Sequence, residues 1–237
     1  MKARGGTAVM AARASVIDGL DYFPTPPWAS RALVADVLPQ LGVAFHTAGM
    51  TLWEPAAGGG HMVEALRPYF REAFASDVYD YGRGYAVGSF VGQGADVARC
   101  PFKPDLIATN PPFNKALEFA ELALETARVG VALLVRSAWA EGGDRYRTLF
   151  KDRPPSMIAQ FVERVAMVKG RWDPNASTAT SYAWFIWRKA DRSGRCAYFW
   201  IPDGAKARHS SANDVELFGG RSLVQESPIS LHRSVLK

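Results

Sequence analysis

Cysteine is scarce in this 237-residue sequence, and a long apolar run is missing altogether. The two cysteines, Cys100 and Cys196, stand far apart without the spacing of metal ligands, so neither a disulfide framework nor a zinc site is expected. No apolar run approaches the roughly 18 to 20 residues needed to cross a bilayer, and Arg4 and Arg13 interrupt the N-terminal stretch. These absences argue against disulfide-rich secreted proteins and membrane proteins, and they predict a soluble intracellular protein.

Histidine is also rare, and its positions do not form a cluster. The four residues are scattered, so no metal centre is predicted and none of them is expected to be catalytic; they are His46, His61, His209 and His232. His61 most simply begins a helix beside a glycine-rich loop.

The charge is distributed unevenly along the chain. Lys and Arg number 28 against 23 Asp and Glu, and the surplus lies in residues 121–237, which hold 18 basic and 12 acidic side chains. One stretch is especially basic and suits contact with a phosphate backbone; it contains Arg188, Lys189, Arg192, Arg195, Lys206 and Arg208. The equally simple alternative is a solvated basic face that aids solubility.

The pattern of apolar residues predicts one α/β domain over residues 21–203. Residues 1–20 are expected to be a flexible N-terminal segment, and residues 204–237 a polar, mobile tail. Strands and helices alternate in the manner of a mostly parallel sheet; the ranges are helix 27–41, strand 51–54, helix 61–68, strand 73–77, strand 105–109, helix 116–127 and strand 130–136. After a short helix near 144–151, residues 158–168 and 182–187 are predicted to pair at the sheet edge, and 197–201 to add a strand or pack outside.

Residues 54–60, Glu-Pro-Ala-Ala-Gly-Gly-Gly, follow a predicted strand and precede a predicted helix. Glycines in such a turn let backbone N–H groups approach a ligand closely. Asp77 ends the next strand about twenty residues downstream, where an acid in nucleotide-binding α/β folds bonds ribose hydroxyls. By itself the loop could also be a tight strand-to-helix connection.

Residues 110–113, Asn-Pro-Pro-Phe, end another apolar strand. An exocyclic amine is a poor nucleophile, and it gains when both of its hydrogens are bonded as the nitrogen pyramidalises. The Asn110 side-chain oxygen and the Pro111 carbonyl could accept those two bonds, Pro112 would stiffen the loop, and Phe113 offers a flat face for a base. The alternative is a stiff turn in which Asn110 bonds its own backbone.

Together and in this order, the two motifs resemble S-adenosylmethionine-dependent amino-methyltransferases, most closely the adenine-N6 DNA methyltransferases of phage and prophage type. The resemblance covers roughly residues 21–188. It implies a Rossmann-like fold, a mostly parallel sheet with an antiparallel edge strand and helices on both faces. It also implies S-adenosyl-L-methionine as cofactor, held by Phe23, Pro24, Thr25, Glu54, Pro55, Ala56, Gly58, Gly60, Asp77, Asp96 and Asn110.

Within that resemblance each cofactor residue has a role. Glu54 would lie near the methionine amino group, Ala56 and Gly58 against the cofactor backbone, and Asp77 on the ribose. The Phe-Pro-Thr-Pro segment at 23–26 would cover the methionine end, and Asp96 would receive the adenine amino group.

The target base would be flipped out and held between two faces, Phe113 and Trp172. Lys169, Arg171 and Arg188 would meet phosphate. The alternative for Trp172 is an exposed edge hairpin whose indole folds back onto the sheet.

The acceptor itself stays open at this point. Relatives with such a motif methylate adenine N6, cytosine N4, guanine N2 in RNA, or a glutamine side chain, and a non-catalytic nucleic-acid-binding module is a further alternative. DNA adenine is the favoured partner, in the cytoplasm of a bacterial or phage-infected cell and associated with its nucleoid. No separate recognition domain follows the core, so sequence specificity would come from loops in 137–181 and the basic tail, or be relaxed.

Overall fold

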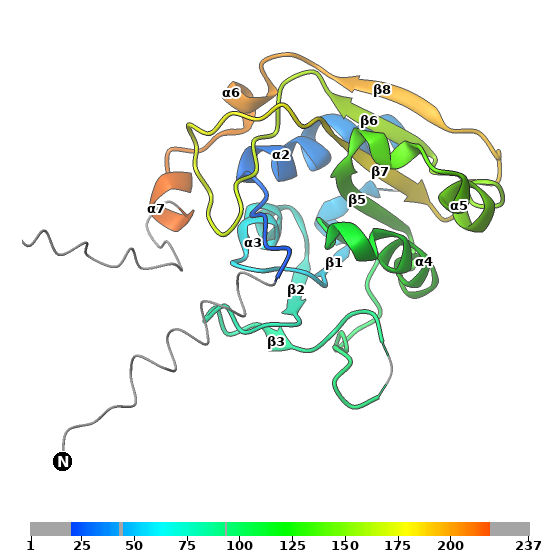
Figure 1. Cartoon of the computed structure of the whole chain (residues 1–237), viewed down its shortest axis with the longest axis horizontal. Helices are drawn as coiled ribbons and strands as arrows, with labels where there is room; N and C mark the ends of the chain where they lie inside the picture. The colour runs from blue at the N-terminus through cyan, green and yellow to red at the C-terminus, as the bar shows by residue number, and fades with distance from the viewer. Residues whose placement is uncertain (1–19, 43–44, 93, 219–237) are drawn as a thin grey trace, which may run out of the picture.

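The structure is a computed structural model that describes residues 20–42, 45–92 and 94–218 (Figure 1). An eight-stranded sheet with the order β3-β2-β1-β4-β5-β7-β6-β8 runs through it. The strands are β1 (Thr51–Glu54), β2 (Glu72–Asp77), β3 (Ala86–Val87), β4 (Leu106–Thr109), β5 (Gly130–Arg136), β6 (Met157–Phe161), β7 (Tyr182–Arg188) and β8 (Ala197–Ile201). The predicted segment 1–20 lies almost wholly outside the described residues, and so does 219–237.

Five neighbouring strands, from β3 to β5, are parallel. Strands β1 and β4 are buried along their whole length and β5 along all but its last residue, as expected for strands covered on both faces. Pairing of Trp53 with Ile107 and of Thr109 with Leu133 aligns their carboxyl ends. Glu54, Asp77 and Asn110 therefore emerge at one edge of the sheet.

The antiparallel strand is present, but its predicted place at the sheet edge is wrong. Strand β7 pairs with β5 on one side and with β6 on the other, and its first six residues are buried. A strand this apolar needs neighbours and covers on every side, so it lies inside the sheet. The edge is β8, which runs parallel to β6 and exposes Tyr198 and Trp200.

Helices cover both faces of the sheet (Figure 1). One face carries α2 (Pro27–Ala32) and α3 (His61–Leu66), and the other carries α4 (Ala116–Thr126) and α5 (Gly143–Arg145). The helix predicted over 27–41 is present along that whole range, but its hydrogen-bonding pattern changes: α2 continues into a π-helical segment, η1 (Leu33–Val37), and then into a 3-10 segment, η2 (Leu38–Leu41), which contains Pro39. The remaining short helical segments are η4 (Thr47–Gly49), η5 (Arg67–Tyr69), η6 (Phe113–Lys115), η7 (Ser137–Ala140) and η8 (Tyr146–Phe150).

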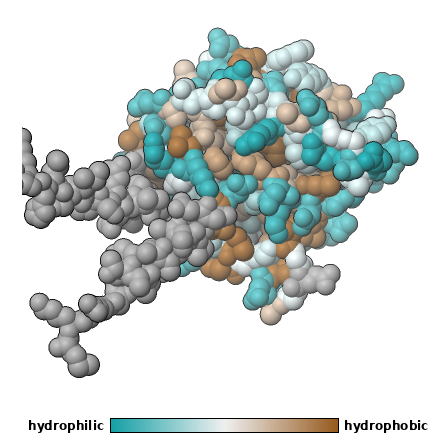
Figure 2. All heavy atoms as spheres, in the orientation of Figure 1, coloured by the Kyte–Doolittle hydropathy of each residue, from teal (hydrophilic) through white to brown (hydrophobic). Residues whose placement is uncertain are grey.

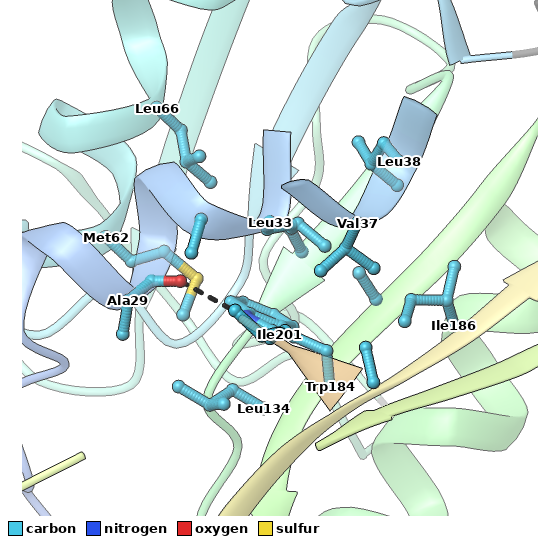
Figure 3. Packing of buried hydrophobic residues seen from close by; sticks show 14 of the residues in the cluster. Ala29, Leu33, Val37, Leu38, Met62, Leu66, Leu134, Trp184, Ile186 and Ile201 are labelled. Atoms are coloured by element: carbon cyan, nitrogen blue, oxygen red, sulfur yellow. Dashed lines mark hydrogen bonds between the residues drawn. The ribbon is translucent and has the colours of Figure 1, made fainter. Parts of the chain in front are cut away.

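The core under α2 and α3 is built around Trp184 of β7 (Figure 3). Its ring is fully buried, and its indole N–H donates a hydrogen bond to the Ala29 carbonyl at 3.1 Å. Burying an indole normally requires such a partner for its N–H. This bond ties α2 to β7, and it thereby positions the Phe-Pro-Thr-Pro segment that precedes α2.

Residues 204–218, which the sequence analysis assigned to the tail, form two short helices packed on the domain. Helix α6 (Ala205–His209) contacts α2, and α7 (Asp214–Phe218) is held by an ion pair between Arg31 and Asp214 at 2.6 Å. The Asp214 carboxylate is 5% exposed, so this pair is far less screened than a surface one. Local composition cannot reveal it, because the two partners are 183 residues apart.

The described part of the chain has several further general features. None of its helices combines the length and apolar character that a bilayer crossing demands. No group of three His, Cys, Asp or Glu residues within it could hold a metal ion. Both cysteines are free thiols; Cys100 is half-buried and Cys196 exposed. The face drawn in Figure 2 intersperses hydrophilic residues with hydrophobic ones.

Candidate active site

A cavity of about 540 Å³ opens at the carboxyl ends of β1, β2 and β4. Strand order reverses between β1 and β4, and open α/β sheets bind ligands in the crevice outside such a point. Most of the residues predicted from sequence line it together, namely Phe23, Pro24, Thr25, Glu54, Pro55, Ala56, Gly58, Asp77, Asn110, Pro112 and Phe113. Residues far apart in the chain thus line the same cavity.

Glu54 is a buried carboxylate without a full set of partners. It is 2% exposed, and no hydrogen-bond partner reaches its Oε2 in the described part of the chain. Burial raises its pKa well above the usual range, and the nearby Asp77 and Glu64 charges add to that rise, while the Val63 N–H opposes it. An orphaned acid of this kind fits a ligand that brings a positive charge or an N–H donor.

Asp77, at the end of β2, shapes the loop and faces the cavity at once. Its Oδ2 accepts a hydrogen bond from the Gly58 N–H at 2.8 Å, and its Oδ1 accepts one from the Tyr79 N–H at 3.0 Å. Burial raises its pKa, and these N–H groups oppose the rise. The carboxylate therefore fixes the glycine loop and keeps acceptor capacity for a hydroxyl.

The Tyr22 side chain occupies the space that a Cβ would need at two of the three loop glycines. The sequence analysis did not single out Tyr22. Gly58 has a left-handed φ of 51°, and a Cβ there would lie 2.5 Å from the Tyr22 ring. A Cβ at Gly59 would collide with the Tyr22 hydroxyl, and one at Gly60 with Tyr85. In this structure the glycines therefore make room for aromatic side chains. The available signal was position: Tyr22 directly precedes the Phe-Pro-Thr-Pro segment.

Asn110 is held by a segment remote in sequence. Its Nδ2 donates to the Phe23 carbonyl at 2.9 Å and lies 3.5 Å from the Met167 sulfur. These contacts fix the orientation of the amide. Its Oδ1 is left as a free acceptor, since no described residue donates a hydrogen bond to it. Asn110 therefore does not bond its own backbone, as the turn alternative required. The amide is oriented for a donor that enters the cavity.

Phe113 lies in the same loop, between two planar groups. Its backbone N–H donates to Asp21 at 3.0 Å, and its ring is 5.1 Å from the Phe23 ring. The guanidinium carbon of Arg136 lies 4.2 Å from the ring centroid. An exposed cation–π contact contributes about 0.5–1 kcal/mol, less than the roughly 1–3 kcal/mol of a stacked base. Sequence analysis missed Arg136, although it ends the strand next to Asn110.

Comparisons with known proteins agree with this geometry at the level of the fold. No protein-family model matches the sequence, and no curated protein matches it either. Among solved structures, the methyltransferase subunit of a type I restriction-modification system from Streptococcus thermophilus is 11% identical with a TM-score of 0.55; the match covers 78% of this chain and 51% of that one. The M protein of the type I restriction enzyme EcoKI is 13% identical with a TM-score of 0.52, covering 81% and 52%.

The chain has a Rossmann-like methyltransferase fold. It spans about half the length of these solved structures. The cavity described above occupies the cleft that this methyltransferase fold leaves at the carboxyl edge of its parallel strands.

Several predicted site residues lie outside the cavity of the methyltransferase fold. Pro111 is buried beneath its loop, and Gly60 faces Tyr85. Asp96 is exposed; only its backbone carbonyl reaches the site region, where it accepts the Ser89 N–H at 2.8 Å. Ser89, Phe90 and Val91 line the cavity instead.

Arg188 lies at the opposite end of the sheet from the site. It pairs with Gly130 at the start of β5, whereas Arg136 at the end of β5 pairs with Tyr182. Arg188 was predicted to meet phosphate; the structure places it away from Asn110, because β7 is antiparallel and carries its last residue to the other end of the sheet. Arg136 takes the basic position beside the loop.

The predicted base-clamping loop is ordered, but Trp172 faces a different neighbour than expected. A bridge between Val168 and Arg171 closes its tip, and the Gly170 N–H donates to the Tyr22 carbonyl at 2.9 Å. The Trp172 ring lies 6.5 Å from His61 and 6.2 Å from Phe218, and Phe113 is not among its ring neighbours. Trp172 therefore neither faces Phe113 across a base site, as predicted, nor folds back onto the sheet, as the alternative required. Lys169 and Arg171 are exposed.

His61 should make the stability of the protein sensitive to acid. Its two ring nitrogens have no hydrogen-bond partner in the described structure, and burial, with Arg83 nearby, lowers its pKa to about 4. The unfolded side chain titrates near pH 6.5, so between these values only the unfolded state binds the proton, and stability falls as pH falls. Between pH 7 and 5 we expect a loss of about 2 kcal/mol from this residue.

The test compares wild type with His61→Phe, whose ring can keep the 4.9 Å stack on Phe218. Urea unfolding at pH 7 and at pH 5 should show a smaller loss in the variant, and the exposed His46→Ala should behave as wild type. Equal losses in wild type and His61→Phe would show that His61 is not the source.

Proposed function

We propose that this chain is an S-adenosylmethionine-dependent methyltransferase that acts on the N6 amino group of a flipped-out adenine in DNA. The observation that carries the proposal is the Asn110 amide, whose Nδ2 is taken by the Phe23 carbonyl and whose Oδ1 is left as an acceptor at the rim of the cavity. An acceptor fixed beside a flat aromatic ring suits a planar amine better than a hydroxyl or a carbon.

The cavity residues fit the cofactor. Glu54 has the unpartnered oxygen that an ammonium group would satisfy, and Asp77 offers acceptors for ribose hydroxyls. Phe90 and Val91 supply an apolar wall for a base. When bound, S-adenosylmethionine supplies an activated methyl group on a positively charged sulfur. Glu54 would also neutralise part of the positive charge that enters this buried site.

The chain's own contribution to transfer is positioning. Asn110 Oδ1 would accept one amino hydrogen, and the carbonyl of Pro111, a residue next to the cavity but not in its lining, would accept the other; the Pro112 carbonyl is already taken by the Lys115 N–H at 2.9 Å. The prolines hold the direction of these acceptors. Most of the rate gain would come from orientation and from hydrogen bonds that strengthen as the nitrogen pyramidalises. No general base of raised pKa is needed.

Three observations support DNA adenine as the acceptor. The motif pair resembles phage-type adenine-N6 DNA methyltransferases, the two solved structures above belong to type I restriction systems, and the second half of the chain carries the basic surplus. Arg136, Lys169 and Arg171 lie on elements at the carboxyl edge of the sheet, where a backbone would pass. The extent of sequence recognition is a separate question, since the chain is about half as long as those structures.

The test is a competition for labelled methyl transfer among duplex DNA, structured RNA and a protein extract, followed by nucleoside digestion and mass spectrometry. N6-methyladenine in DNA as the main labelled product is the expected result. Label in RNA guanine or adenine, or in glutamine, would show that the acceptor is not DNA adenine, while the proposed methyl transfer to an amino group would stand. Failure to bind S-adenosylmethionine at millimolar concentration would instead indicate a non-catalytic nucleic-acid-binding module.

A further inference from the structure

Arg136 covers the ring of Phe113, which is the surface that the proposed function assigns to the target base. Its guanidinium carbon is 4.2 Å from the ring centroid. Because Thr109 at the end of β4 pairs with Leu133, Arg136 at the end of β5 lies on the same edge of the sheet as the loop that follows β4. This places a flat cation where a flat base would stack.

Phe113 has other neighbours besides Arg136. Phe23 packs at 5.1 Å, and Asp21 accepts the Phe113 N–H. The ring also lines the cofactor cavity, which Arg136 does not. A base that stacks on the ring face that Arg136 covers must take the space of the guanidinium.

Arg136 is held by few contacts among the described residues. Its side chain is exposed, and it makes no ion pair with any residue that the structure describes. It interacts with the Tyr182 phenol, whose pKa is raised by burial and lowered in part by a hydrogen bond from this guanidinium and by its charge. A cation in such a position loses little when it leaves the ring, and its planar fork suits a phosphate.

We propose that Arg136 holds the place of the base in the free protein and moves to the phosphate beside the flipped nucleotide when the base enters. The inference rests on the proposed function and adds to it a residue that positions the target strand. The contact with Phe113 keeps the aromatic face covered until a nucleotide arrives. The contact with phosphate then favours the flipped state over the stacked one.

The two halves of the exchange predict effects of opposite sign for Arg136→Ala. Without the guanidinium the ring face is open, so a free adenosine, which has no phosphate, should bind about two- to fivefold more tightly. An oligonucleotide should bind more weakly, with a KM about tenfold higher and kcat within about twofold. The slope of log affinity against log salt should fall by about one, because one phosphate contact is lost.

Adenosine binding is measured by saturation-transfer NMR with S-adenosylhomocysteine filling the cavity, and oligonucleotide binding by fluorescence anisotropy with a 2-aminopurine target to report flipping. Arg136→Lys should recover the salt slope, since Lys also binds phosphate. Arg71→Ala is the control, because Arg71 is exposed and precedes β2 at the opposite end of the sheet. Thermal unfolding checks that each variant folds.

An unchanged salt slope in Arg136→Ala would overturn the proposal, whatever the adenosine result. Weaker binding of both ligands with an unchanged slope would assign Arg136 a structural role only. If wild type transfers methyl to no DNA adenine, the proposed function fails. If wild type transfers normally and only the Arg136→Ala results disagree, the placeholder role alone is wrong.

Discussion

Replacing Asn110 by Ala is expected to lower methyl transfer about 10²- to 10³-fold while S-adenosylmethionine affinity changes only a few-fold. The variant loses the acceptor that faces the cavity and the bond that holds it to the Phe23 carbonyl. The loss should appear in kcat, because the amino group gains acidity and needs the acceptor most as the nitrogen pyramidalises. Cofactor binding is largely kept, since Glu54 and Asp77 are untouched.

Asn110→Asp separates the two functions of this side chain. It keeps an oxygen at the acceptor position but replaces the donor to the Phe23 carbonyl by a second oxygen that repels it. We expect an activity between those of wild type and Asn110→Ala. Asn213→Ala is the matched control, because Asn213 is exposed and only its backbone makes described hydrogen bonds. Single-turnover transfer and calorimetric cofactor binding measure both quantities, and full turnover in Asn110→Ala would remove the proposed mechanism.

Replacing Glu54 by Gln is expected to have the opposite profile: cofactor affinity falls about 10²- to 10³-fold while the unliganded protein becomes more stable. The neutral amide of this variant would leave an incoming ammonium group without a buried counter-charge. In the free protein, however, the buried carboxylate of Glu54 has no partner on Oε2, and the substitution removes the cost of its charge.

The pH dependence has a definite sign. Burial raises the Glu54 pKa above its unfolded value, so its contribution to stability is full below the unfolded pKa and is lost as pH rises toward the folded pKa. The stability advantage of Glu54→Gln should therefore grow from pH 4 toward pH 8. Cofactor affinity of wild type should rise over the same interval, because binding needs the carboxylate ionised. His61 is present in both proteins, and its effect cancels in the difference.

Glu64→Gln is the control for Glu54→Gln. Glu64 is half-buried beside it, but its pKa is lowered, mainly by Arg67, so its pH dependence has the reverse sign. Its bonds run to Arg67 and Tyr85, away from the cavity. Thermal unfolding and calorimetry across pH measure all three proteins. If Glu54→Gln binds S-adenosylmethionine as tightly as wild type does, the Glu54 carboxylate does not bind the cofactor.

The convergence of Glu54, Asp77 and Asn110 could be predicted from the sequence, because each follows a buried strand and parallel strands end at one edge. The purpose of the glycines could be predicted only in part. A positive φ at Gly58 agrees with a glycine turn, but the group that needs the space is Tyr22, which comes from a separate segment. No spacing rule relates the two.

The sequence by itself determined the parallel half of the sheet, the order of the motifs and the edge at which they meet, since strand patterning and turn chemistry are local. Tertiary structure alone decided the rest. It placed β7 inside the sheet, turned Arg188 away from the site, laid Arg136 on Phe113 and tied α7 to α2 through Arg31 and Asp214. Each of these depends on pairing direction or on contacts between distant residues, whose energies arise only once the chain has folded.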